Sequence, residues 1–316
     1  MKRVHLIGGP ETEALEPEVV GNKAANIAAM ARMGLPVPPA FVLPVAFNAK
    51  LAKGKPKALA ALDDALAEGI AFLEARTGRR FGDRRRPLLV SVRSGAARSM
   101  PGMLETVLDV GATEDAAAGL VRLTGNPRFA LDCRRRFLEA YAETVLGIDP
   151  APLAHALEAL VAAEGVDSDR DLDAVALATH VRAALDHVAE AGHRIPAAPL
   201  DQLRAAALAV FASWEQPKAV TYRKLHGYED LEGTAVTVQA MVYGNADARS
   251  AAGVAFSRDP ARGENSAGGR TAVRRPGRGR RLRTPHASGL RRPRRPPPRG
   301  RDAAHRRARR SGTCLP

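Results

Sequence analysis

The distribution of arginine divides the chain at about residue 265 and limits how much of it can fold into a packed structure. Residues 266–316 hold 17 Arg, no Lys and a single acid, Asp302, which gives this stretch a charge of +16. The remaining residues hold 31 basic and 33 acidic side chains, a charge of −2. The net charge of +14 therefore belongs to residues 266–316 and says nothing about the rest of the chain.

Residues 266–316 also lack the pattern of a packed segment. They contain seven Pro and seven Gly in 51 residues, no aromatic residue, and neither the helical nor the strand period. Such a composition buries too little apolar surface to offset chain entropy. We expect a disordered tail here, which would bind polyanions nonspecifically through counterion release.

Composition excludes several classes of protein for the chain as a whole. No apolar run approaches the roughly 18–20 residues that span a bilayer, and Met1–Pro10 has too short an apolar stretch for a signal peptide. Two cysteines, Cys133 and Cys314, make neither a disulfide framework nor a metal cluster. We expect a soluble, cytoplasmic protein.

Apolar periodicity predicts a mixed α+β body. We expect a helical subdomain inserted between two α/β parts, because a long helical block separates two stretches with strands. The strands are expected at 3–7, 40–43, 88–92, 234–243 and 253–257, and the helices at 17–33, 56–77, 115–191 (broken at 125–127 and 147–152) and 201–214. The expected divisions are a first α/β lobe at 1–111, the helical subdomain at 112–200, a second and incomplete lobe at 201–265, and the tail at 266–316.

Two motifs carry chemistry. The run GNKAAN at 21–26 opens a helix with small residues, and Lys23 within it is placed to reach a phosphate. A lysine on a helix is more often a solvated charge. The run PLLVSVRSGAARSMPGM at 87–103 is more informative, because a buried strand delivers Arg93 into a hydroxyl-rich loop. The guanidinium fork suits phosphate oxygens, and the alternative is an arginine in a structural ion pair.

Five segments together resemble the amino-terminal nucleotide-binding domain of pyruvate, phosphate dikinases. They are GNKAANIAAMARMGLPVPP at 21–39, PLLVSVRSGAARSMPGMLETVLDVG at 87–111, NPRFALDCRRRFLEAYAETVLGI at 126–148, FASWEQPKAVTYR at 211–223 and GTAVTVQAMVYGNADARSAAGVAFSRDPARGE at 233–264. The SMPGM loop is the discriminating element, since phosphoenolpyruvate synthase and the glucan dikinases continue differently after VRS. The resemblance implies an ATP-grasp-like domain with the nucleotide held between two α/β lobes.

The resemblance also implies roles for particular residues at the phosphate end. Lys23 and Arg93 are expected to contact the phosphates and to stabilise the transferring group. Ser94 and Met103 of the following loop are expected beside the nucleotide. Arg136 is a weaker candidate, because three adjacent arginines leave the register open and a solvated helix face is the alternative.

At the base end, the resemblance implies that adenine lies along the strand that holds Gln239, Met241 and Val242, bound mainly through the backbone. An ordinary core strand is the alternative, and both can hold at once. The run SAAG at 250–253 departs from the family, which commonly has a Ser-Gly-x-Gly turn there. We expect a stiffer hairpin and retained binding.

After Gly263-Glu264 the family continues with an acidic segment of the type GE-(apolar)-NAQGEDVVAG-x-RTP, whose carboxylates and glutamine resemble ligands for Mg²⁺. Residues 269–284 of this chain contain no such ligands. Reading the degenerate codons from the second base of the Gly269 codon permits GELLFDAQGEDVVSGR. We therefore expect a change of reading frame between about Glu264 and Gly269, and metal ligands missing from this chain.

The family's reaction converts ATP, phosphate and pyruvate to AMP, diphosphate and phosphoenolpyruvate, and the intact family is expected to be homo-oligomeric. The mobile histidine domain and the pyruvate-binding barrel do not fit into 316 residues. His180 and His226 are expected to be surface residues rather than phosphoryl acceptors. We expect a truncated ATP-binding fragment without turnover. The alternatives are a fragment of a water dikinase such as phosphoenolpyruvate synthase, and a non-catalytic protein that binds polyanions through its tail.

Overall fold

The computed structural model describes residues 3–52, 56–247, 249–259, 262–265 and 268–273. Its contacts divide the chain into a unit that reaches to Ala252 and a second unit that begins at Gly253. The first unit contains all ten α-helices of the described residues and a five-stranded sheet.

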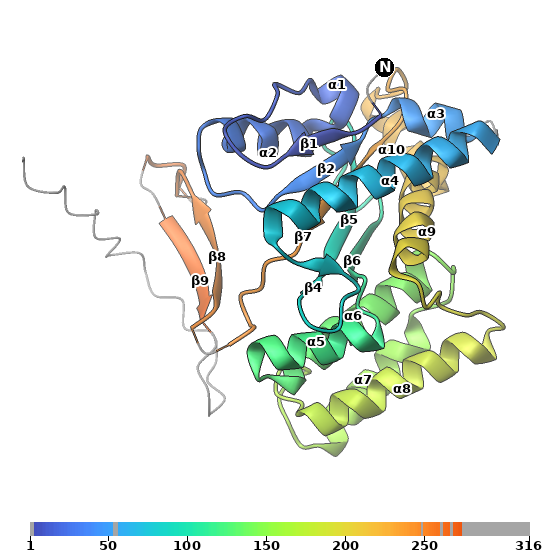
Figure 1. The fold of residues 1–316 in the computed structure, drawn as a ribbon, viewed down its shortest axis with the longest axis vertical. Helices are drawn as coiled ribbons and strands as arrows, with labels where there is room; N and C mark the ends of the chain where they lie inside the picture. The colour runs from blue at the N-terminus through green and yellow to red at the C-terminus, as the bar shows by residue number, and fades with distance from the viewer. Residues whose placement is uncertain (1–2, 53–55, 248, 260–261, 266–267, 274–316) are drawn as a thin grey trace, which may run out of the picture. The chain divides into compact units, whose positions relative to one another are not determined.

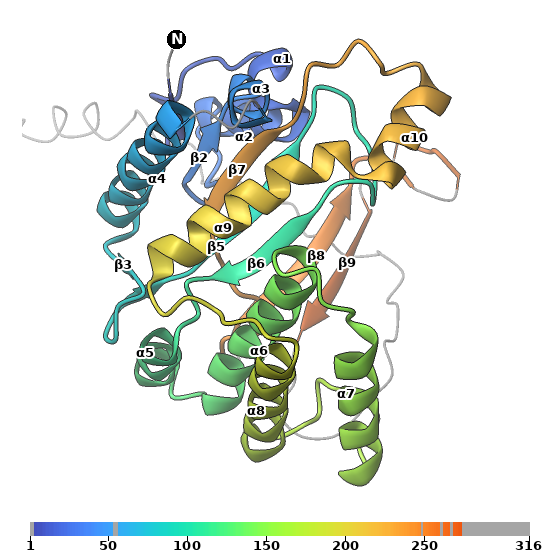
Figure 2. The ribbon, with the colours of Figure 1, turned by 90° about the vertical axis from the view of Figure 1, so that its right-hand side faces the viewer.

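The sheet is antiparallel throughout and has the order β1-β2-β7-β5-β6 (Figures 1 and 2). Its strands are β1 (His5–Ile7), β2 (Ala40–Leu43), β7 (Ala235–Ala240), β5 (Val90–Gly95) and β6 (Thr106–Val110). The last of these strands along the chain, β7, is the central one. The expected second lobe at 201–265 therefore differs from the structure, because the register of β7 with both β2 and β5 places it in the sheet of the first lobe.

The two faces of the sheet are covered by different helices. One face packs on α4 (Pro56–Thr77) and α9 (Pro199–Ala212) through a core that includes Phe41, Val92 and Val238. The other face packs on α1 (Pro17–Val20) and α2 (Asn22–Arg32) around Val42, Ala24 and Val20. This second face is called the α2 face below. Figure 1 shows α2 and α4 on opposite sides of the strands.

Four helices follow β6: α5 (Glu114–Thr124), α6 (Pro127–Thr144), α7 (Ala151–Ala163) and α8 (Ala174–Glu190). The starts of α5, α6 and α8 are set by the side chains of Thr113, Asn126 and Asp173, each of which accepts a hydrogen bond from a backbone amide in the first turn. Large apolar residues of α6 belong to the same core as the sheet. The stretch expected to be a helical subdomain is thus helical, and its helices share a core with the sheet.

Local backbone geometry explains where the expected elements differ from the observed ones. The single helix expected at 17–33 is two helices, because Gly21 has φ +78° and breaks the hydrogen-bond ladder. The helical block also breaks at 164–173, between α7 and α8. Additional elements are α3 (Ala46–Ala52), the short strands β3 (Arg80–Phe81) and β4 (Pro87–Leu88), the strand β6, a 3₁₀ turn (Ser213–Glu215) and α10 (Pro217–His226).

The second unit is described only in part. Strands β8 (Ala251–Phe256) and β9 (Gly268–Val273) pair into a two-stranded sheet. Strand β9 lies in the segment expected to be disordered, so the backbone there is ordered at residues 268–273. The other residues of the expected tail lie outside the described residues. None of the described helices is long and apolar enough to cross a membrane.

Candidate nucleotide site

The start of α2 is held against the end of β5 by two glycines. Gly21 has φ +78°, and a Cβ atom there would lie 2.2 Å from the carbonyl oxygen of Gly95. The Asn22 amide donates to the Ala96 carbonyl at 2.9 Å. Because side chains are excluded from this contact, the first turn of α2 approaches β5 closely, and Lys23 in that turn lies at the end of the strand.

Arg93 is a half-buried arginine on β5 whose side chain has no hydrogen bond or ion pair with the described residues. It pairs across the sheet with Thr237 on β7 and with Thr106 on β6. Its Nε atom and the Thr237 Oγ1 atom are buried and have no hydrogen-bond partner among the described residues. In the same part of the chain no carboxylate forms an ion pair with Arg93. Directly paired residues share a face, so these two unsatisfied groups lie together on the α2 face.

Lys23 is close enough to Arg93 for each charge to affect the other. Its side chain is exposed, yet partial burial of the ammonium group lowers the pKa of Lys23, and the neighbouring Arg93 charge lowers it further. Two adjacent cations without an acid are unfavourable for the isolated chain, and a bound polyanion would relieve the repulsion. The site therefore has the charge of a phosphate-binding centre.

The strand expected to carry adenine lies on the same sheet. Gln239 is on the α2 face, where its Nε2 donates to the Pro38 carbonyl at 3.0 Å. The Met241 amide donates to the Leu89 carbonyl at 2.9 Å, which extends the β5–β7 pairing beyond β7. Leu89 precedes Arg93 by four residues, a span of about 13 Å along a strand. Val242, beside Met241, is 72% exposed.

A family model described as pyruvate phosphate dikinase, AMP/ATP-binding domain, matches residues 57–274 of the chain. The chain belongs to this family. Arg93, Gln239 and Met241 lie within the matched residues, whereas Lys23 precedes them.

Curated relatives give the same result over more of the chain. The pyruvate, phosphate dikinase of Rhizobium meliloti (strain 1021) is 43% identical over 83% of this chain and 30% of the relative. The chloroplastic pyruvate, phosphate dikinase 1 of Oryza sativa subsp. japonica is 43% identical over 83% of this chain and 28% of the relative. The pyruvate, phosphate dikinase of Clostridium symbiosum is 38% identical over 80% of this chain and 29% of the relative. The chain thus spans about 30% of the length of the dikinases that it matches.

Two of the expected nucleotide contacts, Ser94 in β5 and Met103 in the loop that follows, are placed differently from Arg93. Ser94 follows Arg93 in the strand, so its side chain is directed to the opposite face of the sheet. Met103 is half-buried and packs in a small cluster around Met100 and Trp214. The loop of this dikinase domain is therefore anchored by its methionines, and the exposed residues at its tip are Pro101 and Gly102.

The structure resolves the register of the three arginines on α6. Arg135 is 5% exposed and lies among acids, whereas Arg136 is 45% exposed and its Nε lies 3.1 Å from the Asp132 Oδ2. Arg134 donates to the Ala112 carbonyl at 3.2 Å. The charge of Arg136 acts on Asp109, and no described contact joins it to Lys23 or Arg93.

Asp109 is a second feature that the sequence motifs did not indicate. It is 3% exposed, has φ +54°, and accepts a hydrogen bond from the Tyr243 hydroxyl at 2.9 Å. Burial raises the pKa of Asp109 to about 6, while the Tyr243 hydrogen bond and the Arg136 charge lower it. In the sequence, the only sign of this group is an aspartate inside the apolar strand TVLDV at 106–110. The contact ties β6 to the segment that follows Met241.

The remaining expectations for this dikinase domain concern metal ligands and two histidines. No group of three or more His, Cys, Asp or Glu side chains in the described ranges is placed to hold a metal ion. His226 is exposed, as expected. The expectation that His180 is a surface residue is wrong: it is 2% exposed between α6 and α8, and its Nε2 lies 2.8 Å from the Glu139 Oε1.

Proposed function

We propose that this chain binds ATP on the α2 face of its sheet, as the nucleotide-binding part of a pyruvate, phosphate dikinase. The phosphates would lie at Lys23 and Arg93, and adenine would lie along the backbone of Met241 and Val242. The observation that carries the proposal is the pair of neighbouring cations, Lys23 and Arg93, with which no acid among the described residues forms an ion pair.

The chemistry of the two cations fits the phosphate end. Arg93 has donors left for two oxygens of one phosphate, and Lys23 contributes a point charge beside it. The Thr237 hydroxyl, which also lacks a partner among the described residues, would bind a phosphate oxygen or orient the Arg93 fork. Ser94, Met103 and Arg136 remain part of the proposal only as a second layer around the nucleotide.

At the level of the whole reaction, we propose the family's conversion of ATP, phosphate and pyruvate to AMP, diphosphate and phosphoenolpyruvate. Lys23 and Arg93 would neutralise charge on the transferring group. The described residues offer no cluster of three or more His, Cys, Asp or Glu side chains that could hold Mg²⁺. An ATP-grasp arrangement and a cytoplasmic location belong to the same proposal; some relatives are chloroplastic.

ATP binding by the purified chain, measured by isothermal titration calorimetry, tests the proposal. Arg93→Ala and Lys23→Ala should each weaken ATP about 10–100-fold, because each removes a charge-assisted contact. Arg32→Ala is the matched control, since Arg32 is exposed at the other end of α2. Unchanged affinity in Arg93→Ala, or an equal loss in Arg32→Ala, would mean that ATP is held elsewhere, for instance by residues 266–316.

A further inference from the structure

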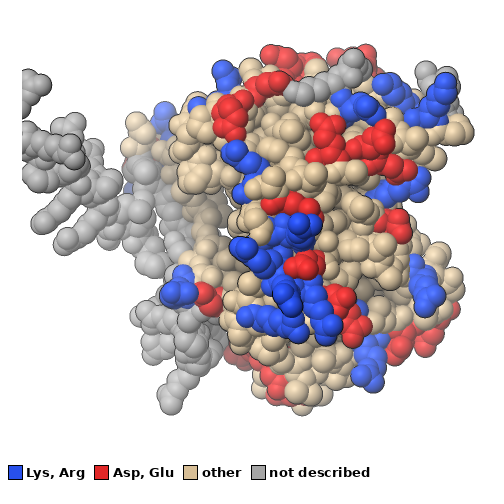
Figure 3. All heavy atoms as spheres, viewed as in Figure 1, with Lys and Arg blue, Asp and Glu red and all other residues tan. Residues whose placement is uncertain are grey.

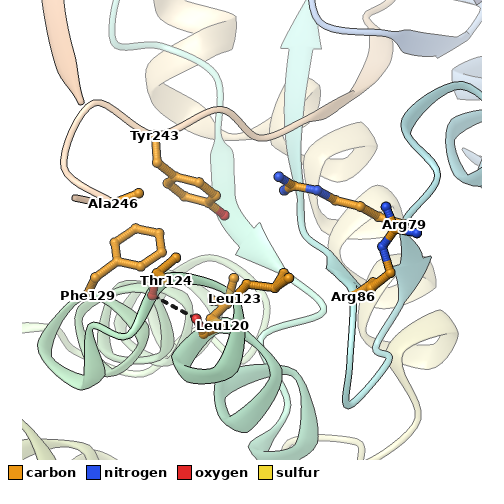
Figure 4. Close-up of a pocket in the computed structure, with 8 residues that line it drawn as sticks. All are labelled: Arg79, Arg86, Leu120, Leu123, Thr124, Phe129, Tyr243 and Ala246. Carbon is orange, nitrogen blue, oxygen red and sulfur yellow. Dashed lines mark hydrogen bonds between the residues drawn. The ribbon is translucent and has the colours of Figure 1, made fainter. Parts of the chain in front are cut away.

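A cavity of about 240 Å³ lies beside the segment that follows Met241 (Figure 4). None of the proposed nucleotide contacts lines it. Its wall combines apolar side chains with two arginines, contributed by β3 and β4 with their flanks, α5, α6 and the segment after β7. The residues that matter are Arg79, Arg86, Leu120, Leu123, Phe129 and Tyr243.

One wall of the cavity is aromatic, and its polar group, the Tyr243 hydroxyl, already has a hydrogen-bond partner in the protein. The rings of Phe129 and Tyr243 meet edge to face, with centroids 4.8 Å apart and an interplanar angle of 76°. The Tyr243 hydroxyl donates to Asp109 at 2.9 Å, so the ring presents only its apolar surface to a ligand. Leu120 and Leu123 of α5 extend this apolar wall, and Figure 4 shows them facing the two rings.

The opposite wall carries two guanidinium groups that form no ion pair with any acid in the described part of the chain. In Figure 4 the Arg79 side chain extends toward the Tyr243 ring, and Arg86 lies beside it. The Arg80 amide donates to the Arg86 carbonyl at 2.9 Å, which holds the two ends of this loop together. Over the described ranges, neither Arg79 nor Arg86 forms a side-chain hydrogen bond or an ion pair.

The acids near these arginines are committed to other groups. The Asp83 Oδ2 accepts from the backbone amides of Arg85 and Arg86, at 3.0 and 2.7 Å, and these hydrogen bonds lower the pKa of Asp83. Asp115 lies 3.6 Å from Arg84. Figure 3 shows basic side chains gathered on this face around β4 and α5. The positive charge at the cavity is thus left for an external anion.

We propose that this cavity binds a small organic anion: a flat apolar body that carries one phosphate or carboxylate. The ring of such a ligand packs against Phe129 and Tyr243, and its anionic group meets the forks of Arg79 and Arg86. The volume suits a molecule smaller than a nucleotide. The proposal is independent of the ATP site, because it uses other residues and another ligand class.

Phenyl phosphate is the probe, titrated into the full-length chain by calorimetry, with inorganic phosphate and phenol as its two halves. We expect phenyl phosphate to bind more tightly than either half. Arg79→Ala and Arg86→Ala should each weaken it about tenfold or more, because each removes a charge-assisted contact. Leu123→Phe, which fills the cavity without changing charge, should also abolish binding.

Two variants separate this site from other sources of positive charge. Arg85→Ala removes one charge from the same loop but does not line the cavity, and Arg93→Ala removes the proposed phosphate contact for ATP. Both should bind phenyl phosphate like the parent chain. Equal losses in Arg85→Ala and Arg79→Ala, loss in Arg93→Ala, or no binding at millimolar concentration overturns the proposal. Thermal unfolding of each variant confirms that it is folded.

Discussion

Arg135 and Arg93 are both shielded arginines in one chain, and they have opposite surroundings. Arg135, on α6, reaches Asp132 at 2.8 Å, Glu139 at 2.9 Å and Asp169 at 3.0 Å. The side chain of Arg93, on β5, forms no ion pair and no hydrogen bond among the described residues, and its charge acts on the cation Lys23.

This difference in hydrogen-bond partners distinguishes an arginine with a structural role, Arg135, from one that is proposed to bind a ligand, Arg93. Both residues have a buried Nε without a partner, so that feature alone does not distinguish them. What distinguishes them is the terminal nitrogens, which are satisfied in Arg135 and not in Arg93. Burial alone would lower the pKa of Arg135, but Glu139 and Asp132 outweigh it and raise that pKa, so the charge is stable where it is.

The largest effect should come from removing the structural arginine. Arg135→Met leaves the acids of α6 without their cation, and we expect the free energy of unfolding to fall by about 3–5 kcal/mol. Urea denaturation followed by circular dichroism measures this. Arg182→Met, at an exposed position on α8, is the control and should change little. A loss below about 1 kcal/mol for Arg135→Met would erase the contrast with Arg93.

Asp109 should give an intermediate effect that depends on pH. Burial raises its pKa from 3.8 to about 6, so the folded chain favours the protonated form. Stability from this group is present in full below about pH 4 and is lost as the pH rises through 6. A difference of about 2 in pKa corresponds to about 3 kcal/mol at most.

Asp109→Asn should remove the loss of stability that accompanies ionisation of Asp109. Asparagine also adopts a φ of +54° more readily than most residues, so the backbone conformation is retained. The variant should therefore be more stable than the parent near pH 8 and equally stable at about pH 2.5, where Asp109 is protonated in both states. Urea denaturation at the two pH values tests this. A parallel offset at both would assign the effect to backbone geometry instead of titration.

The smallest effect on stability should come from Arg93. Arg93→Met removes a charge that repels Lys23, so without nucleotide the unfolding free energy should change by about 1 kcal/mol or less, toward greater stability. The same variant should lose the stabilisation that ATP gives the parent chain. Thermal unfolding with and without ATP measures both quantities. Destabilisation as large as that of Arg135→Met would make Arg93 structural.

Periodicity predicted most helices and the strands β1, β2, β5 and β7, because each has a clear apolar pattern. It did not predict the break at Gly21, since a glycine inside a helical pattern does not reveal its φ. It also did not predict where β7 lies. Sheet order is decided by pairing between residues distant in sequence, such as Arg93 with Thr237.

The candidate site shows the same limit. Resemblance to the dikinases supplied Lys23 and Arg93, and the structure brings them together. It could not choose among the three arginines at 134–136, because that choice depends on the rotation of α6 against α8. Thr237 and Asp109 were missed since a polar residue in a strand has meaning only once its neighbours across the sheet are known.

The central position of β7 has a consequence for biosynthesis. While the chain emerges from the ribosome, β2 and β5 are complete long before the strand that must lie between them. Until then both strands expose unpaired edges, which are prone to pair with other chains. A chain that ends before β7 would lack the strand that joins the two halves of the sheet, and it would lack both proposed sites, because Met241 and Tyr243 follow β7 in the sequence.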